Sequence, residues 1–174
     1  SEKALEYAQH LAEKFKVRNV VIKQGNIFSM PFNDRSFDFT WNLGVIEHYD
    51  TDQVTSIFRE MIRVTGEHGQ VAIGVPSFKS VQIMKASLLR HPSLKWIPGY
   101  RLESEKDYKE EEIISLIRKA AKVEKREVDE IEVTYFGNPL PMETPRLVIR
   151  VLGGIIEEIF PKRKFLIFVV CVVK

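Results

Sequence analysis

The chain has 174 residues, of which 44% are hydrophobic and 29% charged, with only 9 glycines and 8 prolines. This composition fits one globular domain with a substantial core and excludes a disordered chain. The 26 basic and 24 acidic residues leave a formal charge of +2, and the lysines and arginines are interleaved with glutamates rather than gathered into a stripe. We therefore expect no nucleic-acid partner.

The single cysteine, Cys171, lies in the longest apolar run, "FLIFVVCVV" at 165–173. One cysteine excludes an intrachain disulfide, and an apolar setting favours a buried, unreactive thiol in a reducing, cytoplasmic environment. The run is far shorter than the roughly 20 residues that span a bilayer, so it predicts a buried strand and no membrane span.

The first half of the chain predicts two helices and two strands. Small and apolar residues recur on one face of a helix over 2–15, and "RNVVIKQGN" at 18–26 reads as a short β-branched strand. After the loop "IFSMPFNDRS", a second strand is predicted at 37–43. The next helix has its apolar face between 54 and 62. Its expected cap is Asp50, Thr51 or Asp52, and its expected end is at Gly66 and Gly69.

The second half continues the alternation. A nearly continuous apolar strand is predicted at 70–75, followed after Pro76 by a long loop with a short helix. A helix at 109–121 precedes "EIEVTYF", which alternates as a strand with one wet face does. "TPRLVIRVLGGIIEEIF" then predicts a helix with a threonine cap and proline in its first turn.

Helices that alternate with short hydrophobic strands indicate an α/β fold with a mostly parallel sheet in a single domain. Ligands of open α/β sheets bind beyond the carboxyl ends of the strands, where the strand order reverses. Three short stretches would lie at that edge: "GNIF", "NLGVIEHY" and "VPSF".

Two stretches carry a resemblance to a known family. "NVVIKQGNIFSMPFNDRSFDFTWNLGVIEHY", followed by "FREMIRVTGEHGQVAIGVPS", resembles the middle of a class I S-adenosylmethionine-dependent methyltransferase of the small-molecule type, the branch that includes quinone-biosynthesis enzymes. The order and spacing of the short motifs within these stretches, rather than any single motif, is what is specific to the family. The similarity continues more weakly through "DYKEEEIISLIRKAA" and the closing strands, so it covers essentially the whole chain.

The resemblance implies a Rossmann-like sheet with strand order 3-2-1-4-5-7-6, in which the strands of this chain correspond to numbers three to seven. The first two strands, the first helix and any G-x-G-x-G loop are absent from the sequence. We therefore expect residues 1–174 to form a single truncated methyltransferase domain. Loss of strands one and two would leave strand three without a partner and bare an edge of strand four. Either the native chain supplies those strands, or the chain pairs its strands in a new way, for example as a homodimer through the bared edge.

The resemblance also implies S-adenosylmethionine as cofactor and a small-molecule substrate. Asn26 stands where the family usually has an aspartate that accepts a hydrogen bond from the adenine amino group, and the side-chain carbonyl of asparagine can accept the same bond. The backbone N–H of the next residue, Ile27, would meet a ring nitrogen. An asparagine after a glycine is also a common turn residue, so both interpretations stay open.

The end of the strand at 37–43 is the second candidate cofactor contact. By the resemblance, Asn42, Leu43 and Gly44 pass the methionine part of the cofactor, with backbone carbonyls facing its amino group. Asn42 could instead simply cap the end of a strand.

His48, beside Glu47, is the candidate catalytic residue, because a neutral imidazole can take a proton from a substrate hydroxyl. Methyl transfer from a sulfonium is a direct displacement that depends mostly on alignment, so a positioning or structural role for His48 is favoured over a role as base.

The remaining histidines and aromatic residues give weaker indications. His10, His68 and His91 show no ligand spacing, so no metal site is expected. In the segment that often covers the substrate in this family, three aromatic residues would either stack on an acceptor or anchor a long loop. They are Trp96, Tyr100 and Tyr108.

The sequence leaves two functions open. The first is a methyltransferase acting on an O, N or C atom of a small molecule. The second is a non-catalytic, methyltransferase-like module for binding or dimerisation. Half of a nucleotide-binding dehydrogenase is disfavoured because the dinucleotide fingerprint is absent.

Overall fold

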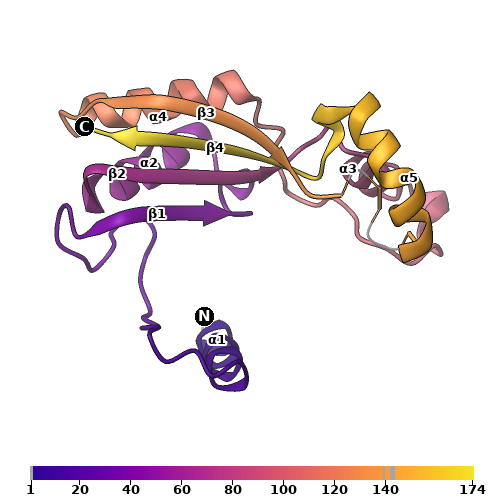
Figure 1. The fold of residues 1–174 in the computed structure, drawn as a ribbon, viewed down its shortest axis with the longest axis horizontal. Coiled ribbons are helices and arrows are strands. Elements are labelled where there is room, and N and C mark those ends of the chain that lie inside the picture. The colour runs from indigo at the N-terminus through magenta and orange to yellow at the C-terminus, as the bar shows by residue number, and fades with distance from the viewer. Residues whose placement is uncertain (1, 139, 142–143) are drawn as a thin grey trace.

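The computed structural model describes residues 2–138, 140–141 and 144–174, and its centre is a four-stranded sheet (Figure 1). The strands are β1 (Phe37–Leu43), β2 (Thr65–Pro76), β3 (Val128–Phe136) and β4 (Leu166–Val173), in the order β1-β2-β4-β3. This confirms the α/β class and the order expected for strands four, five, seven and six. The prediction of a mostly parallel sheet is wrong: β1 and β2 are parallel, but β4 runs antiparallel to both of its neighbours.

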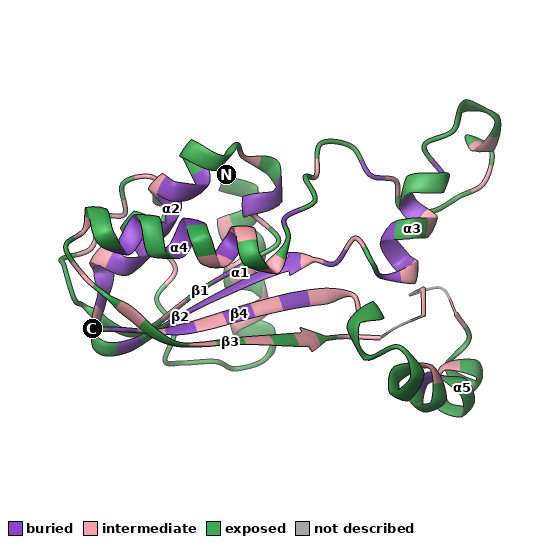
Figure 2. Cartoon of the chain, turned by 90° about the horizontal axis from the view of Figure 1, so that it is seen from above, coloured by how far each residue is buried: buried purple, intermediate pink, exposed green. Residues whose placement is uncertain are grey.

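Two helices, α2 (Thr51–Val64) and α4 (Glu110–Val123), cover one face of the sheet (Figure 2). The main hydrophobic core lies between them and the strands. Its fully buried members include Ile57, Phe58, Ile62, Ile113, Ile117, Ile73 and Val169. Cys171 belongs to the same core, and burial raises the pKa of its thiol to about 11, as expected for an unreactive cysteine.

Asp50 is the cap of α2. Its Oδ1 accepts a hydrogen bond from Gln53 N at 2.8 Å, and Gln53 Oε1 accepts one from Asp50 N at 3.1 Å, which completes a capping box. The predicted helix end at Gly66 and Gly69 is wrong, because α2 ends at Val64 and β2 already begins at Thr65. Glycine at position 69 instead lets two backbone segments approach closely.

A second, smaller lobe lies beyond one end of the sheet (Figure 1). It contains α3 (Val81–Leu88), capped by Ser80, and α5 (Arg146–Ile159). A small separate core of Ile83, Ala86 and Leu102 holds α3 in place. The threonine cap predicted for α5 is wrong, since Pro145 occupies the N-cap position without a side-chain bond. Short 3-10 helices complete the chain: η1 (Ile46–His48), η2 (Pro92–Leu94) and η3 (Pro161–Arg163).

The predicted first helix is present as α1 (Glu2–Lys14), but none of its residues is buried, and it lies away from the sheet (Figure 1). The strand predicted at 18–26 is wrong. Residues 18–25 have no regular structure and are exposed except for Ile22, and Val21 is 80% exposed. β1 is the last strand on this side, so no strand of the described chain lies where this segment could pair. A β-branched sequence alone does not form a strand.

The sheet face opposite α2 and α4 is apolar and largely open. Phe39, Trp41 and Leu43 alternate along β1 on this face, and Trp41 is 62% exposed. Register pairing places Ala72 beside Trp41, followed by Val170 of β4. The bared strand edge expected from the resemblance is therefore confirmed, together with an uncovered apolar face beside it.

Gly69 offers a test of the tight junction between β1 and the start of β2. A Cβ at this position would lie 2.7 Å from Thr65 Cγ2 and 3.0 Å from the carbonyl oxygen of Asp38. We expect Gly69→Ala to lower the free energy of unfolding by about 1–3 kcal/mol, because backbone and a stiff β-branched side chain must move. Urea denaturation measures this change.

Gly154→Ala is the matched control, since a Cβ there would meet nothing within 4 Å. Alanine inside α5 should leave the stability unchanged or raise it by up to about 1 kcal/mol. Equal stability of Gly69→Ala and the wild type would contradict the close approach.

Candidate active site at the strand ends

The candidate site lies at the carboxyl ends of the parallel strands β1 and β2. The chain leaves β1 through Gly44, whose φ of 68° lies in the left-handed region that favours glycine. The backbone N–H of Gly44 donates to the carbonyl oxygen of Gly74 at 2.9 Å, so the two strand ends are joined directly. η1 follows, and Ser77 follows β2.

Three polar side chains at this edge are buried with unpaired oxygens. Asn42 is 7% exposed, Glu47 is 3% exposed and Ser77 is fully buried. Among the residues that the structure describes, Asn42 Oδ1, Glu47 Oε2 and Ser77 Oγ have no hydrogen-bond partner. A buried polar atom without a partner costs about 1–3 kcal/mol, so these oxygens are expected to be paired by donors of a ligand or by water.

Glu47 lies at the centre of this group. Burial raises the pKa of its carboxyl group, and a backbone hydrogen bond and the neighbouring His48 oppose that rise only in part. Its Oε1 lies 3.5 Å from the position that a Cβ of Gly44 would take. Its backbone carbonyl accepts a hydrogen bond from Lys106 N at 2.8 Å, which fastens η1 to the segment before α4.

The segment over 100–108 closes over η1. His48 is exposed, and its Nδ1 lies 3.1 Å from Ser104 Oγ. Tyr108 is buried and donates its hydroxyl hydrogen to the carbonyl oxygen of Tyr49 at 2.9 Å, which is the loop-anchoring alternative for this residue. Tyr100 donates to the carboxylate of Glu105, and burial together with this bond raises the pKa of Tyr100 to about 12.

The structure also places the predicted adenine contacts. Asn26 Oδ1 accepts a hydrogen bond from Phe28 N at 3.0 Å, so its carbonyl closes a turn of its own loop, and Asn26 is exposed. Ile27 is half-buried against the main core. The rings of Phe28 and Tyr49 meet edge to face at 5.3 Å, which holds this loop beside η1.

Arg63 of α2 holds the same loop from the other side. Its guanidinium donates to the carbonyl oxygens of Met30 and Phe32 and pairs with Asp34 at 2.7 Å. Glu60 accepts from Arg63 Nε at 2.8 Å and from Met30 N at 2.7 Å. The hydrogen bond from Arg63 lowers the pKa of Glu60. Sequence reasoning missed these Arg63 contacts, for which the three-residue spacing of Glu60 and Arg63 on one helix was the available signal. It placed Ser77 at this edge within "VPSF" but gave the residue no role.

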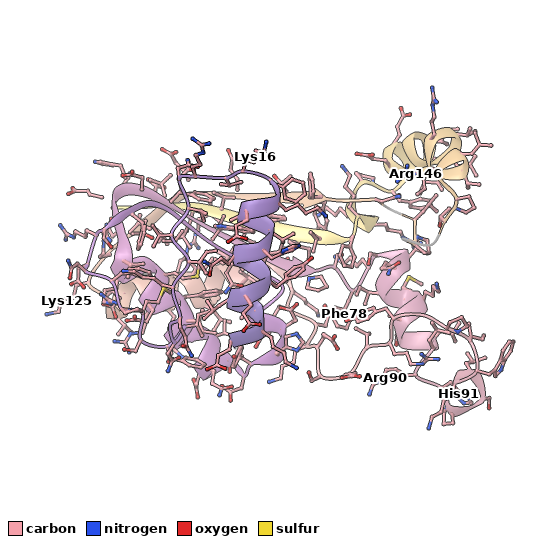
Figure 3. The ribbon with its side chains drawn as sticks, turned by 90° about the horizontal axis from the view of Figure 1, so that it is seen from below. Lys16, Phe78, Arg90, His91, Lys125 and Arg146 are labelled. Atoms are coloured by element: carbon pink, nitrogen blue, oxygen red, sulfur yellow. The ribbon has the colours of Figure 1, made fainter. Side chains whose placement is uncertain are left out.

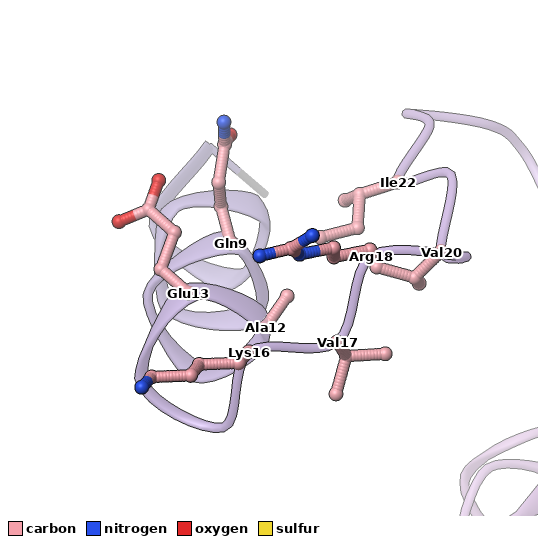
Figure 4. Close-up of a pocket in the computed structure, with 8 residues that line it drawn as sticks. All are labelled: Gln9, Ala12, Glu13, Lys16, Val17, Arg18, Val20 and Ile22. Atoms are coloured by element: carbon pink, nitrogen blue, oxygen red, sulfur yellow. The ribbon is translucent and has the colours of Figure 1, made fainter.

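Of two cavities in the described chain, one adjoins the site and the other does not. One of about 450 Å³ adjoins the strand ends, and its wall includes Ser77, Tyr108 and Lys109. Another of about 620 Å³ lies between α1 and residues 16–22, where Gln9, Glu13 and other polar side chains border it (Figure 4). The second cavity is lined entirely by residues 9–22 and shares no residue with the strand ends.

The described residues contain no group of three or more histidine, cysteine, aspartate or glutamate side chains placed to hold a metal ion. None of the helices in the described ranges is both long and apolar enough to cross a membrane.

Comparisons with known proteins agree with the fold. The profile of the family described as "Methyltransferase domain" matches residues 1–73, which include α1, β1 and α2. A S-adenosylmethionine-dependent methyltransferase from Methanosarcina mazei matches with a TM-score of 0.60 and 17% identity over 100% of this chain and 78% of its own. No curated protein sequence matches at a significant level.

Two further solved structures share the fold. A methyltransferase from Thermotoga maritima, described as a possible histamine N-methyltransferase, has a TM-score of 0.58 and 18% identity over 95% of this chain and 70% of its own. Magnesium protoporphyrin IX methyltransferase from Synechocystis, with bound SAH, has a TM-score of 0.55 and 13% identity over 99% of this chain and 60% of its own. The profile match covers the first part of the chain, residues 1–73, and the solved structures show that the described chain has a methyltransferase-like α/β fold.

Glu47 and Glu60 should give opposite pH dependences of stability. Because the pKa of Glu47 is raised, the folded chain binds the carboxyl proton more tightly than the unfolded chain does. Ionisation of Glu47 therefore lowers the free energy of unfolding once the pH rises above 4.5, the ordinary pKa of a glutamate. We expect Glu47→Gln to raise the free energy of unfolding at neutral pH, with the gain disappearing below that value. Denaturant unfolding across this pH range measures it.

Glu60→Gln is the matched control of opposite sign. Because the pKa of Glu60 is lowered, its carboxylate stabilises the folded chain when the pH lies above 4.5, the ordinary pKa of a glutamate. This stabilisation is lost as the pH falls. This variant should be less stable than the wild type at neutral pH and approach it in acid. If Glu47→Gln were also destabilised at neutral pH, the buried carboxyl would have a partner that the structure does not contain.

Proposed function

We propose that this chain forms part of a methyltransferase that transfers the methyl group of S-adenosylmethionine to a small-molecule acceptor, in a site at the carboxyl ends of β1 and β2. The profile match over residues 1–73 and the shared fold support this proposal, which in addition names the acceptor class and the residues. Quinone-biosynthesis enzymes are the branch to which we assign it, on the resemblance over 19–77.

The observation that carries the proposal is the pair of buried, unpartnered acceptors on either side of Gly44. Asn42 Oδ1 and Glu47 Oε2 require N–H or O–H donors, and a hydrogen bond from a charged donor contributes roughly 1.5–3 kcal/mol. The ammonium group of the cofactor and a hydroxyl or amine of an acceptor are such donors. When bound, S-adenosylmethionine supplies an electrophilic methyl group on a sulfonium.

Each candidate residue then has a role. The backbone of Asn42, Leu43 and Gly44 borders the methionine part of the cofactor, and Asn26 and Ile27 border its adenine. Rotation of the Asn26 side chain out of its turn with Phe28, or use of its second lone pair, serves the adenine contact. His48, exposed and held beside Ser104, orients the acceptor rather than acting as the base.

We further propose that the chain is a truncated domain, whose glycine-rich loop and first two strands are supplied from outside these 174 residues. The exposed segment 18–25 and the unpaired edge of β1 support this proposal, because two additional strands would pair with both. The cofactor site then has one wall in this chain and one wall in the added strands.

A non-catalytic binding or dimerisation module is the second candidate. The observation in its favour is the same open edge with its apolar face at Phe39 and Trp41, which a second copy of the chain could cover. Such a module would need neither cofactor nor acceptor.

Calorimetric titration with S-adenosylhomocysteine tests the first candidate. We expect a form extended upstream to bind, and the 174-residue chain alone to bind weakly or not at all. Gly44→Ala in the extended form should weaken binding about tenfold, since a left-handed φ strains alanine by about 1–2 kcal/mol and displaces the strand end.

Gly66→Ala is the control, because a Cβ there makes only ordinary contacts, the nearest at 3.5 Å, at the opposite end of β2. It should bind as the wild type does. Absence of binding by both the chain and its extended form would overturn the methyltransferase proposal and favour the module.

A further inference from the structure

Helix α5 exposes an apolar stripe along its length. Leu147, Val151, Ile155 and Ile159 recur every four residues and so share one row of the helix surface. Leu147 is 73% exposed and Ile159 is 61% exposed. A second exposed row, Val148 and Leu152, lies beside the first. A contiguous exposed apolar surface of this kind marks an interaction site.

Only the opposite side of α5 faces the protein. Gly153 is its one buried residue, and Ile149 is half-buried. Both border a hollow next to the turn at Gly137. The helix is therefore held by its glycine side and presents its aliphatic side outward.

Basic residues adjoin the stripe at both of its ends. Arg146 and Arg150 form a neighbouring row at the start of the helix, and "PKRK" follows its end. Residues 146–164 hold five basic and two acidic residues. Of the two acidic residues, Glu157 is paired with Lys164.

A hollow of about 510 Å³ is lined by both apolar and basic side chains. Ile159 and Phe160 line it beside Met84 of α3, and the cations Lys79, Lys162 and Arg163 border the same space. All three cations are exposed, and the Arg163 guanidinium stacks on the ring of Phe160 at 4.8 Å. Two separate segments, the loop before α3 and η3, thus place positive charge at the margin of one apolar surface.

We propose that the α5 stripe is a docking surface for an anionic phospholipid bilayer, with its aliphatic row at the level of the acyl chains and Lys79, Lys162 and Arg163 on lipid phosphates. Charge complementarity decides the occupant. An amphipathic helix with an aliphatic face and cations at its margin lies in the interface of an anionic membrane, and a bilayer needs no shape-matched partner for a convex row of side chains.

Docking of α5 on a membrane would orient the candidate active site. The lobe with α3 and α5 lies beyond the same end of the sheet toward which β1 and β2 point (Figure 1). The strand ends would then face the membrane surface. The inference rests on α5 and its cations and does not depend on methyl transfer.

Co-sedimentation with sucrose-loaded vesicles tests the proposal. The chain should sediment with vesicles of phosphatidylcholine mixed with phosphatidylserine, and much less with phosphatidylcholine alone. Lys162→Gln with Arg163→Gln should lower the partition coefficient about fivefold per charge, and added salt should lower it further. Val151→Gln with Ile155→Gln should lower it at least about tenfold.

Two control variants match these changes in number and type. Lys122→Gln with Lys125→Gln removes two exposed cations at the far end of the sheet, where Figure 3 shows Lys125 opposite Arg146. Phe39→Gln with Trp41→Gln removes two exposed apolar side chains from the open face. Both should sediment with anionic vesicles nearly as the wild type does.

Three outcomes would overturn the proposal. One is equal sedimentation with neutral and anionic vesicles, or none with either. Another is equal loss of binding in the α5 variants and their controls. The third is a dimer, seen by light scattering, that Val151→Gln with Ile155→Gln dissociates, which would make a second copy the occupant of α5.

Discussion

The unpaired edge of β1 is the constraint on which the rest of the structure depends. Backbone N–H and C=O groups at a sheet edge need partners, and within the described residues β1 has a neighbour only in β2. The β-branched segment at 18–25 therefore stays exposed, and α1, which leads into it, has no surface to pack on. The open apolar face beside β1 has the same origin. On the other side of the sheet α2 and α4 bury a complete core, so the fold is well packed where its sheet is paired and covered.

The candidate site lies between the well-packed core and the unpaired edge of the sheet. One side of it is rigid: the capping box at Asp50, the Arg63 contacts and the Tyr108 anchor fix the loops around η1. The other side borders the unpaired edge. Burying Asn42, Glu47 and Ser77 without partners costs free energy that the apolar core must offset, and such costs are characteristic of sites that acquire donors from a ligand. Stability and function therefore pull in opposite directions at Glu47.

Periodicity predicted the elements whose stability is local or which lie under a covered face. The helices at 51–64 and 110–123 and the strands at 37–43 and 166–173 follow from apolar spacing and from the cap at Asp50. The strand at 18–26 was wrong because strand formation needs a neighbour that its own residues do not specify. The direction of β4 and the course of β2 through Gly66 and Gly69 depend on contacts between distant segments. For the same reason the contacts of Arg63 were not predicted, and Ser77 was placed at the strand ends within "VPSF" without its burial being foreseen. The roles of Asn26, Ile27, Asn42, Leu43, Gly44 and His48 stay predictions.

Amide hydrogen exchange over 18–25 and β1 tests the central claim most directly. The account predicts rapid exchange of residues 18–25 and of the outward-facing amides of β1 in the 174-residue chain at any protein concentration. In a form extended upstream the same amides should become protected, while α2 and α4 change little. The account would be contradicted if these amides were already protected in the 174-residue chain, either at every concentration or increasingly with concentration as in a dimer. The edge of β1 would then be paired without strands from outside these residues.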